Sequence, residues 1–110
     1  MKTLYNKLVR NNIPEIIEKS GKKANYRNLS NEEFYRALKV KLVEEATELV
    51  NAKTPEEEIE ELADIYEVLM FMPHTKDEIL KVAFKKRMNK GWFSKHVFLE
   101  SVEDDESEES

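Results

Sequence analysis

The chain of 110 residues has no cysteine, only two glycines and three prolines, and a single tryptophan. The absence of cysteine excludes disulfides and thiolate catalysis, and it fits a reducing compartment. So few glycines and prolines favour helices over an all-β fold. No apolar run approaches the ~20 residues of a membrane span, and the first ten residues lack the apolar segment of a signal peptide. We therefore expect a cytoplasmic protein with no membrane partner.

Charged residues make up 37% of the chain, and the net charge is −5. The acidic excess is local, because residues 100–110, ESVEDDESEES, hold seven acidic residues and no basic one. The remainder has 16 acidic and 18 basic residues, and it contains no basic stripe with interleaved aromatics that would indicate nucleic-acid binding. We expect a helical domain over residues 1–100 and an acidic disordered tail over 101–110.

Capping residues divide the chain into helices. Three times a serine or threonine is followed three residues later by a glutamate, as in a capping box: Ser30–Glu33, Thr54–Glu57 and Thr75–Glu78. With Pro14 and Gly21 around a short first helix, the predicted helices cover about 13–20, 31–51, 55–72 and 76–90. The segment HVFLE is expected to form a short strand or an extended arm. The connection AKTP is so short that it makes the two long helices antiparallel neighbours.

The stretch KLVEEATELV in the second predicted helix contains an unexpected carboxylate. On a helical wheel the apolar residues occupy an arc about 80° wide, and they are Phe34, Leu38, Leu42 and Leu49. Glu45 lies inside this arc and Glu48 on its flank, about 60° away. One turn apart on one face, the two carboxylates can converge on a common point.

The third predicted helix has a similar pair in EELADIYEVLMF. Glu61 and Asp64 are three residues apart and flank Val68. This helix is apolar on two sides, which indicates that one side is covered by another subunit. Tyr66 and Phe71 are expected in the core.

Four carboxylates in a partly apolar cleft would repel one another and need positive charge to compensate. Hard divalent cations such as Mg²⁺ prefer oxygen ligands and often bind carboxylates together with substrate phosphates. The alternative is a set of solvated glutamates, with Lys41 paired to Glu45.

The motif EEATE is followed after twelve residues by ELAD. This pattern resembles the EExxE…ExxD signature of the MazG-like all-α nucleoside triphosphate pyrophosphohydrolases. The flanking segments YNKLVRNNIPEIIEKSGKKA and KGWFSKHVFLE are similar to a subgroup labelled phosphoribosyl-ATP pyrophosphohydrolase-like. That subgroup usually has LVRDKIP, where this chain has Asn11 and Asn12 in place of the acidic and basic residues.

The resemblance implies an antiparallel helical bundle that assembles as a homodimer or homotetramer. It implies hydrolysis of nucleoside triphosphates, including non-standard ones, to monophosphate and pyrophosphate. The metal ligands for Mg²⁺, with Mn²⁺ as a substitute, would be Glu45, Glu48, Glu61 and Asp64. Glu44 and Glu45 are the expected catalytic residues, with Glu44 orienting water or supporting the ligands.

The triphosphate also needs cations. The segment FKKRMNKGWF offers several near the end of the last predicted helix: Lys85, Lys86, Arg87 and Lys90. Their alternative role is to complement the helix dipole. Lys7 and Arg10 are further candidates, and Trp92 is expected to pack in the core or to stack on a base. Two other functions stay open: phosphoribosyl-ATP hydrolysis, and a non-enzymatic helical interaction module.

Overall fold

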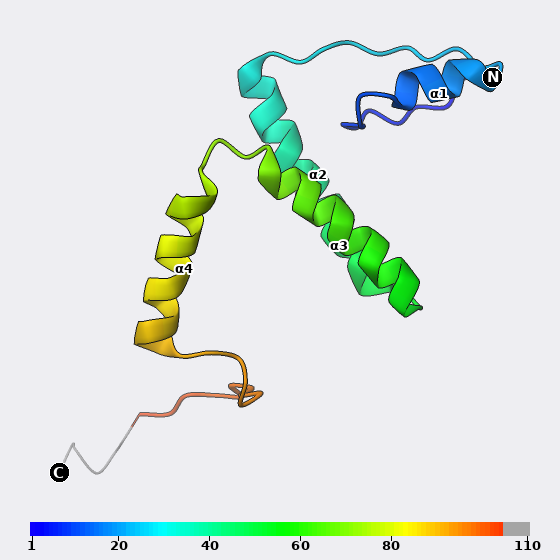
Figure 1. The fold of residues 1–110 in the computed structure, drawn as a ribbon. Helices are drawn as coiled ribbons and strands as arrows, with labels where there is room; N and C mark the ends of the chain where they lie inside the picture. The colour runs from blue at the N-terminus through cyan, green and yellow to red at the C-terminus, as the bar shows by residue number, and fades with distance from the viewer. Residues whose placement is uncertain (105–110) are drawn as a thin grey trace. The chain divides into compact units, whose positions relative to one another are not determined.

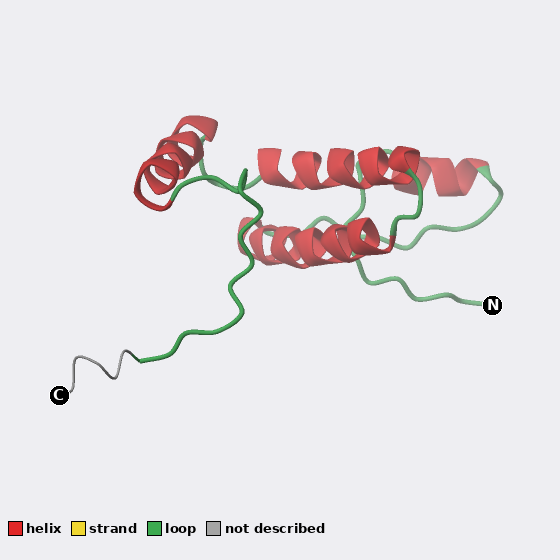
Figure 2. Ribbon diagram, turned by 90° about the horizontal axis from the view of Figure 1, so that it is seen from below, coloured by secondary structure: helices red, strands yellow, loops and turns green. Residues whose placement is uncertain are grey.

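The computed structural model describes residues 1–104, and within this range the chain forms four α-helices and no strand (Figures 1 and 2). The helices are α1 (Ile13–Lys19), α2 (Asn31–Asn51), α3 (Pro55–Met70) and α4 (Lys76–Lys90). The all-α prediction is therefore confirmed. None of these helices combines the length and apolar character that crossing a membrane requires.

The predicted caps account for the ends of α2 and α3. The Ser30 hydroxyl accepts a hydrogen bond from the backbone N–H of Glu33, and the Glu33 carboxylate accepts one from the backbone N–H of Ser30. Thr54 caps α3 in the same way, accepting from the N–H of Glu57. The Glu57 carboxylate, however, accepts from the N–H of Lys53 at 2.8 Å instead of from that of Thr54. Each hydroxyl cap satisfies a backbone N–H that the first helical turn leaves free.

Glycines end the two other helices. Gly21 follows α1 with φ +92°, and Gly91 follows α4 with φ +88°. The N–H of Gly91 donates to the carbonyl of Arg87 at 2.8 Å, which closes the last turn of α4. Only glycine adopts such positive φ values without steric cost, so these positions stop the helices where the sequence predicts.

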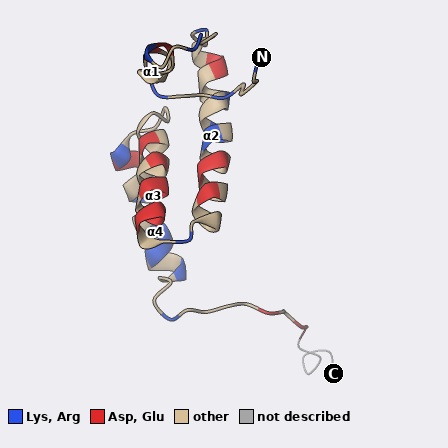
Figure 3. Ribbon diagram, turned by 90° about the vertical axis from the view of Figure 1, so that its right-hand side faces the viewer, with Lys and Arg blue, Asp and Glu red and all other residues tan. Residues whose placement is uncertain are grey.

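The chain divides into two compact units, Met1–Thr75 and a second that begins at Lys76. In the first unit, α2 and α3 are antiparallel and lie side by side, joined by residues 52–54 (Figure 3). Among residues 1–104 only Leu38, Glu45 and Val68 are buried. Leu38 and Glu45 come from α2 and Val68 comes from α3, so the carboxylate of Glu45 belongs to this small core. The prediction of one domain over residues 1–100 stays a prediction.

The second side of α3 is not covered by residues 1–75, the unit to which this helix belongs. Large apolar side chains on α3 stay 45–66% exposed: Ile59, Leu62, Tyr66, Leu69 and Met70. Phe71, directly after the helix, is also exposed. The expectation that Tyr66 and Phe71 are core residues is therefore wrong within residues 1–75, because the antiparallel pair buries only the face of α3 that carries Val68.

The second unit consists of α4 and the segment after it. The Arg87 guanidinium lies over the Trp92 ring, 4.5 Å from its centroid. Trp92 remains 68% exposed, so the core prediction for this side chain is wrong. Residues 97–104 have no regular structure, which agrees with an extended arm and not with a strand. Most of the predicted disordered tail, residues 105–110, lies outside the described residues.

Candidate metal centre

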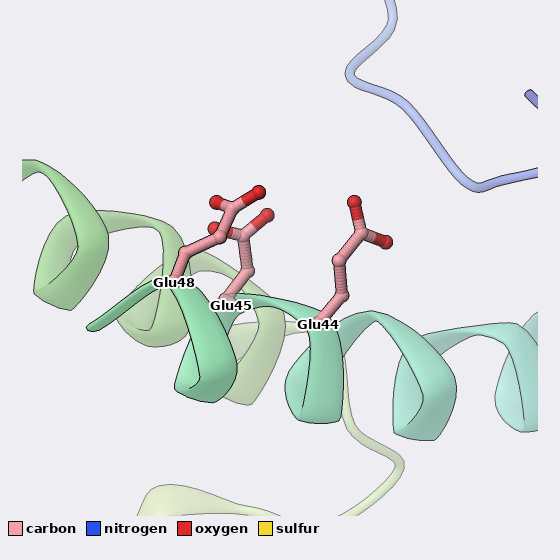
Figure 4. Close-up of side chains that lie close together, drawn as sticks. All are labelled: Glu44, Glu45 and Glu48. Atoms are coloured by element: carbon pink, nitrogen blue, oxygen red, sulfur yellow. The ribbon is translucent and has the colours of Figure 1, made fainter. Parts of the chain in front are cut away.

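Three glutamates of α2 point to the same side of the helix (Figure 4). They occupy positions 44, 45 and 48, so the last two are separated by one turn. Glu45 is 4% exposed, Glu44 is half-buried and Glu48 is exposed. One carboxylate oxygen from each of the three lies within 4.8 Å of the others.

Glu61 and Asp64 of α3 come to the same place. Together with Glu45 they form a second trio whose carboxylate oxygens all lie within 4.8 Å of one another. Acidic segments of α2 and α3 face each other in Figure 3 because the short connection makes the helices antiparallel neighbours. Glu45 belongs to both trios. We call the five residues, Glu44, Glu45, Glu48, Glu61 and Asp64, the carboxylate cluster.

Two oxygens of the cluster are buried without a hydrogen-bond partner among residues 1–104. They are Oε2 of Glu45 and Oε2 of Glu61. A buried acceptor without a donor costs roughly 1–3 kcal/mol, and more when it is charged. Both atoms come from residues of one trio, so the cost falls on neighbouring side chains.

Lys41 compensates part of the charge from the same helix. Its Nζ lies 3.2 Å from Oε1 of Glu45 and 3.4 Å from Oε1 of Glu44. Partial burial lowers the pKa of Lys41, but the bonds with the two glutamates outweigh this effect and raise its pKa overall. The ion pair between Lys41 and Glu45, which the sequence suggested as an alternative to a metal, is therefore present. It leaves Oε2 of Glu45 without a hydrogen-bond donor in the described part of the chain.

Two further cations reach the cluster from the segment before α1. Lys7 Nζ lies 3.4 Å from Oε1 of Glu44, and Arg10 Nη2 lies 2.8 Å from Oδ1 of Asp64. The hydrogen bond to Asp64 raises the pKa of Arg10. Arg10 Nη1 also lies 3.9 Å from Oε1 of Glu67, a residue that the sequence reasoning missed. The sequence could have indicated Glu67 as a neighbour of the cluster, because it lies three residues after Asp64 on the same helix.

The pKa of Glu61 is raised to about 7. The main cause is that a protonated Glu61 can donate a hydrogen bond to Glu45 and to Glu48. Burial of its carboxylate and repulsion by Glu48 and Glu45 add to the shift. A carboxyl group that holds its proton near neutral pH shows that negative charge is in excess at this position.

The cluster fits a hard divalent cation. Its donors are all carboxylate oxygens, the ligand type that Mg²⁺ and Mn²⁺ prefer. If all five carboxylates were ionised, they would outnumber the three basic side chains, Lys7, Arg10 and Lys41, by two negative charges. The raised pKa of Glu61 reduces this excess by one charge when Glu61 holds its proton. The two buried acceptors without donors among residues 1–104 belong to Glu45 and Glu61, the pair at the centre of this excess.

The remaining predicted cations belong to the second unit. These are Lys85, Lys86, Arg87 and Lys90 of α4. Arg87 and Lys90 lie in the last turn of this helix, where basic residues complement the helix dipole. A substrate-binding role for the four stays a prediction. The structure places Lys7 and Arg10 at the cluster, and their binding to substrate also stays a prediction.

Comparisons of this chain with protein-family models, with curated proteins and with solved structures found no match.

Proposed function

We propose that this protein is a Mg²⁺-dependent nucleoside triphosphate pyrophosphohydrolase that forms nucleoside monophosphate and pyrophosphate. The observation that carries the proposal is Glu45, which is 4% exposed and has a buried Oε2 without a hydrogen-bond partner among residues 1–104. Folding alone gives no reason to place the Glu45 carboxylate within 4.8 Å of four further carboxylates, because buried like charges destabilise a protein. The resemblance of EEATE and ELAD to the MazG-like signature supports the same reading.

The proposed ligands are Glu45, Glu48, Glu61 and Asp64. When bound, Mg²⁺ would neutralise phosphate oxygens and lower the pKa of a coordinated water, while Mn²⁺ would serve as a substitute. Lys41 pairs with Oε1 of Glu45 and leaves Oε2 without a hydrogen-bond partner among residues 1–104. Glu44 is 28% exposed at its side chain and can orient an attacking water by accepting a hydrogen bond from it.

The reaction is a displacement at the α-phosphorus. The water oxygen forms a bond to this phosphorus while the bond to the α–β bridging oxygen breaks, and pyrophosphate leaves with the electron pair. The proton of the water passes to a carboxylate of the cluster or to solvent. The protein contributes position and charge compensation more than covalent chemistry.

We further propose that the α2–α3 pair belongs to an antiparallel bundle completed by a second copy, as a homodimer or a homotetramer. The exposed apolar side of α3 supports this assembly, since it presents five large side chains on one helix: Ile59, Leu62, Tyr66, Leu69 and Met70. An uncovered surface of this kind marks an interaction site. Sedimentation at several protein concentrations measures the mass, and a monomer at all of them would contradict the assembly.

Product analysis tests the activity. The protein is incubated with a panel of standard and modified nucleoside triphosphates and with phosphoribosyl-ATP, with and without Mg²⁺, and the products are separated by ion-pair chromatography. Monophosphate and pyrophosphate formed only with Mg²⁺ would support the proposal and rank the substrates. Turnover by Glu45→Gln at the wild-type rate would contradict the role of Glu45.

A further inference from the structure

Two basic side chains of the N-terminal segment, residues 1–12, form ion pairs with the carboxylate cluster. Lys7 contacts Glu44 at 3.4 Å, and Arg10 contacts Asp64 at 2.8 Å. These pairs join residues 37 and 54 positions apart in the sequence. A segment without helical structure is thus held beside α2 and α3 by ion pairs.

Arg10 is bonded to a residue of the proposed metal centre. Asp64 is one of the trio whose oxygens lie within 4.8 Å, and its Oδ1 accepts a hydrogen bond from Arg10 Nη2. A guanidinium at this position compensates Asp64 and opposes the approach of a second positive charge. Arg10 and a divalent cation therefore compete for the same carboxylate.

The contact of Arg10 is built so that it can be exchanged. Its side chain is 56% exposed and that of Asp64 is 38% exposed, and ion pairs exposed to this extent hold only weakly. The Arg10 backbone is anchored separately, because its carbonyl accepts a hydrogen bond from the N–H of Ile13 at 3.1 Å. The side chain can therefore leave Asp64 while the backbone stays at the start of α1.

Resting on the proposed function, we infer that Arg10 is an exchangeable counter-cation, which neutralises Asp64 in the metal-free protein and turns to the substrate phosphates once a divalent cation takes its place. A guanidinium suits both partners, since its planar pair of N–H donors matches carboxylate and phosphate oxygens equally well. Arg10 becomes available to phosphates only when the metal is bound. This coupling favours binding of the triphosphate to the metal-loaded protein, and linkage requires that the phosphates strengthen metal binding by the same factor.

Binding of Mn²⁺ alone, followed by electron paramagnetic resonance of the free ion, tests the competition. Arg10→Gln is compared with wild type and with Arg27→Gln. Arg27 is a matched control because it is also an exposed arginine outside the helices that pairs with a glutamate, Glu33, at 3.0 Å. We expect Arg10→Gln to bind Mn²⁺ about three- to tenfold more tightly than wild type, because a competing and repelling cation is gone. Arg27→Gln should stay within about twofold, since it loses the same charge away from the cluster.

Inorganic pyrophosphate provides the second measurement. In saturating Mn²⁺, calorimetric titration should show that Arg10→Gln binds pyrophosphate about tenfold or more weakly than wild type, because a charged two-pronged donor is lost. Tighter Mn²⁺ binding and weaker pyrophosphate binding in one variant is the signature of exchange. A merely structural Arg10 would weaken both.

Unchanged or weaker Mn²⁺ binding by Arg10→Gln, with normal binding by wild type, overturns the exchange and leaves the proposed function in place. Equal Mn²⁺ binding by wild type and Glu45→Gln overturns both. If Arg10→Gln does not fold, Arg10→Lys decides. It keeps the charge, so we expect Mn²⁺ affinity within about twofold of wild type but pyrophosphate affinity several-fold weaker. Undiminished pyrophosphate affinity in Arg10→Lys overturns the inference.

Discussion

Replacement of Glu45 by glutamine should stabilise the metal-free protein, although Glu45 is one of the most buried residues among positions 1–104. Glutamine has nearly the same shape and keeps an acceptor for Lys41, which now bonds to Oε1 of Glu45 at 3.2 Å. The substitution removes a negative charge that lies within 4.8 Å of four other carboxylates. A residue kept for folding would not behave in this way.

The size of the effect follows from the distances. Two like charges 4.8 Å apart repel by about 3–4 kcal/mol at an effective dielectric constant of about 20. Since Glu44 and Asp64 have their own cations, two such repulsions remain for Glu45. Removing these two repulsions gains more free energy than is lost with the attraction between Glu45 and Lys41, which amounts to about 5 kcal/mol at 3.2 Å and the same dielectric constant. After a discount for partly exposed neighbours, the net gain is about 1–2 kcal/mol.

Thermal unfolding followed by circular dichroism at pH 8 in EDTA measures this gain. The melting temperature of Glu45→Gln should exceed that of wild type by about 5–10 °C. In saturating Mn²⁺ the order of the two melting temperatures should reverse. Mn²⁺ at one hundred times its Kd stabilises wild type by about 2.7 kcal/mol, whereas the variant lacks one of the metal-binding carboxylates and binds Mn²⁺ less tightly. Glu60→Gln, an exposed position on α3 outside the carboxylate cluster, is the matched control and should shift neither value.

A lower melting temperature for Glu45→Gln than for wild type in EDTA would refute the reasoning. It would mean that the ion pair with Lys41 stabilises the fold by more than the surrounding carboxylates destabilise it. Glu45 would then be a structural residue of the α2–α3 pair, and the case for a metal centre would lose its main support.

Three further predictions concern pH and packing. Since the pKa of Glu61 is raised from 4.5 to about 7, its contribution to stability is fully present below pH 4.5 and is lost as pH rises through 7. The metal-free protein should therefore melt higher at pH 5 than at pH 8, and Glu61→Gln should reduce this difference; no pH effect in either protein would contradict the assignment. Ser30→Ala removes the acceptor for the N–H of Glu33 and should cost about 1 kcal/mol in urea unfolding, whereas an unchanged midpoint would show that the cap contributes nothing. Leu38→Ala, at a side chain 3% exposed, should cost about 2–5 kcal/mol in the same assay, and a loss below that of Ser30→Ala would contradict the placement of the core.

The helices were predictable because their ends depend on neighbouring residues. Ser30 and Glu33 satisfy each other's backbone groups within one turn, and Gly91 adopts a φ that other residues avoid. The exposure of Tyr66 and Phe71 was not predictable in the same way. A helix that is apolar on two sides needs a packing partner for each side, and the sequence does not show whether the second partner is part of the same chain or of another subunit.

The carboxylate cluster was predictable in part. Glu45 stands out on a helical wheel because it lies in an apolar arc, and the short connection to α3 brings Glu61 and Asp64 opposite it. The contact of Arg10 with Asp64 spans 54 positions and follows from no local period. Long-range ion pairs of this kind depend on the path of a segment without regular structure, which neither capping nor periodicity specifies.

The most direct test of the proposed activity is hydrolysis of a nucleoside triphosphate in water enriched in oxygen-18, followed by phosphorus-31 NMR. The account predicts that monophosphate and pyrophosphate appear only with Mg²⁺ and that the label enters the monophosphate, because water attacks the α-phosphorus. Label in pyrophosphate, release of orthophosphate with nucleoside diphosphate, or product formation independent of Mg²⁺ would contradict it.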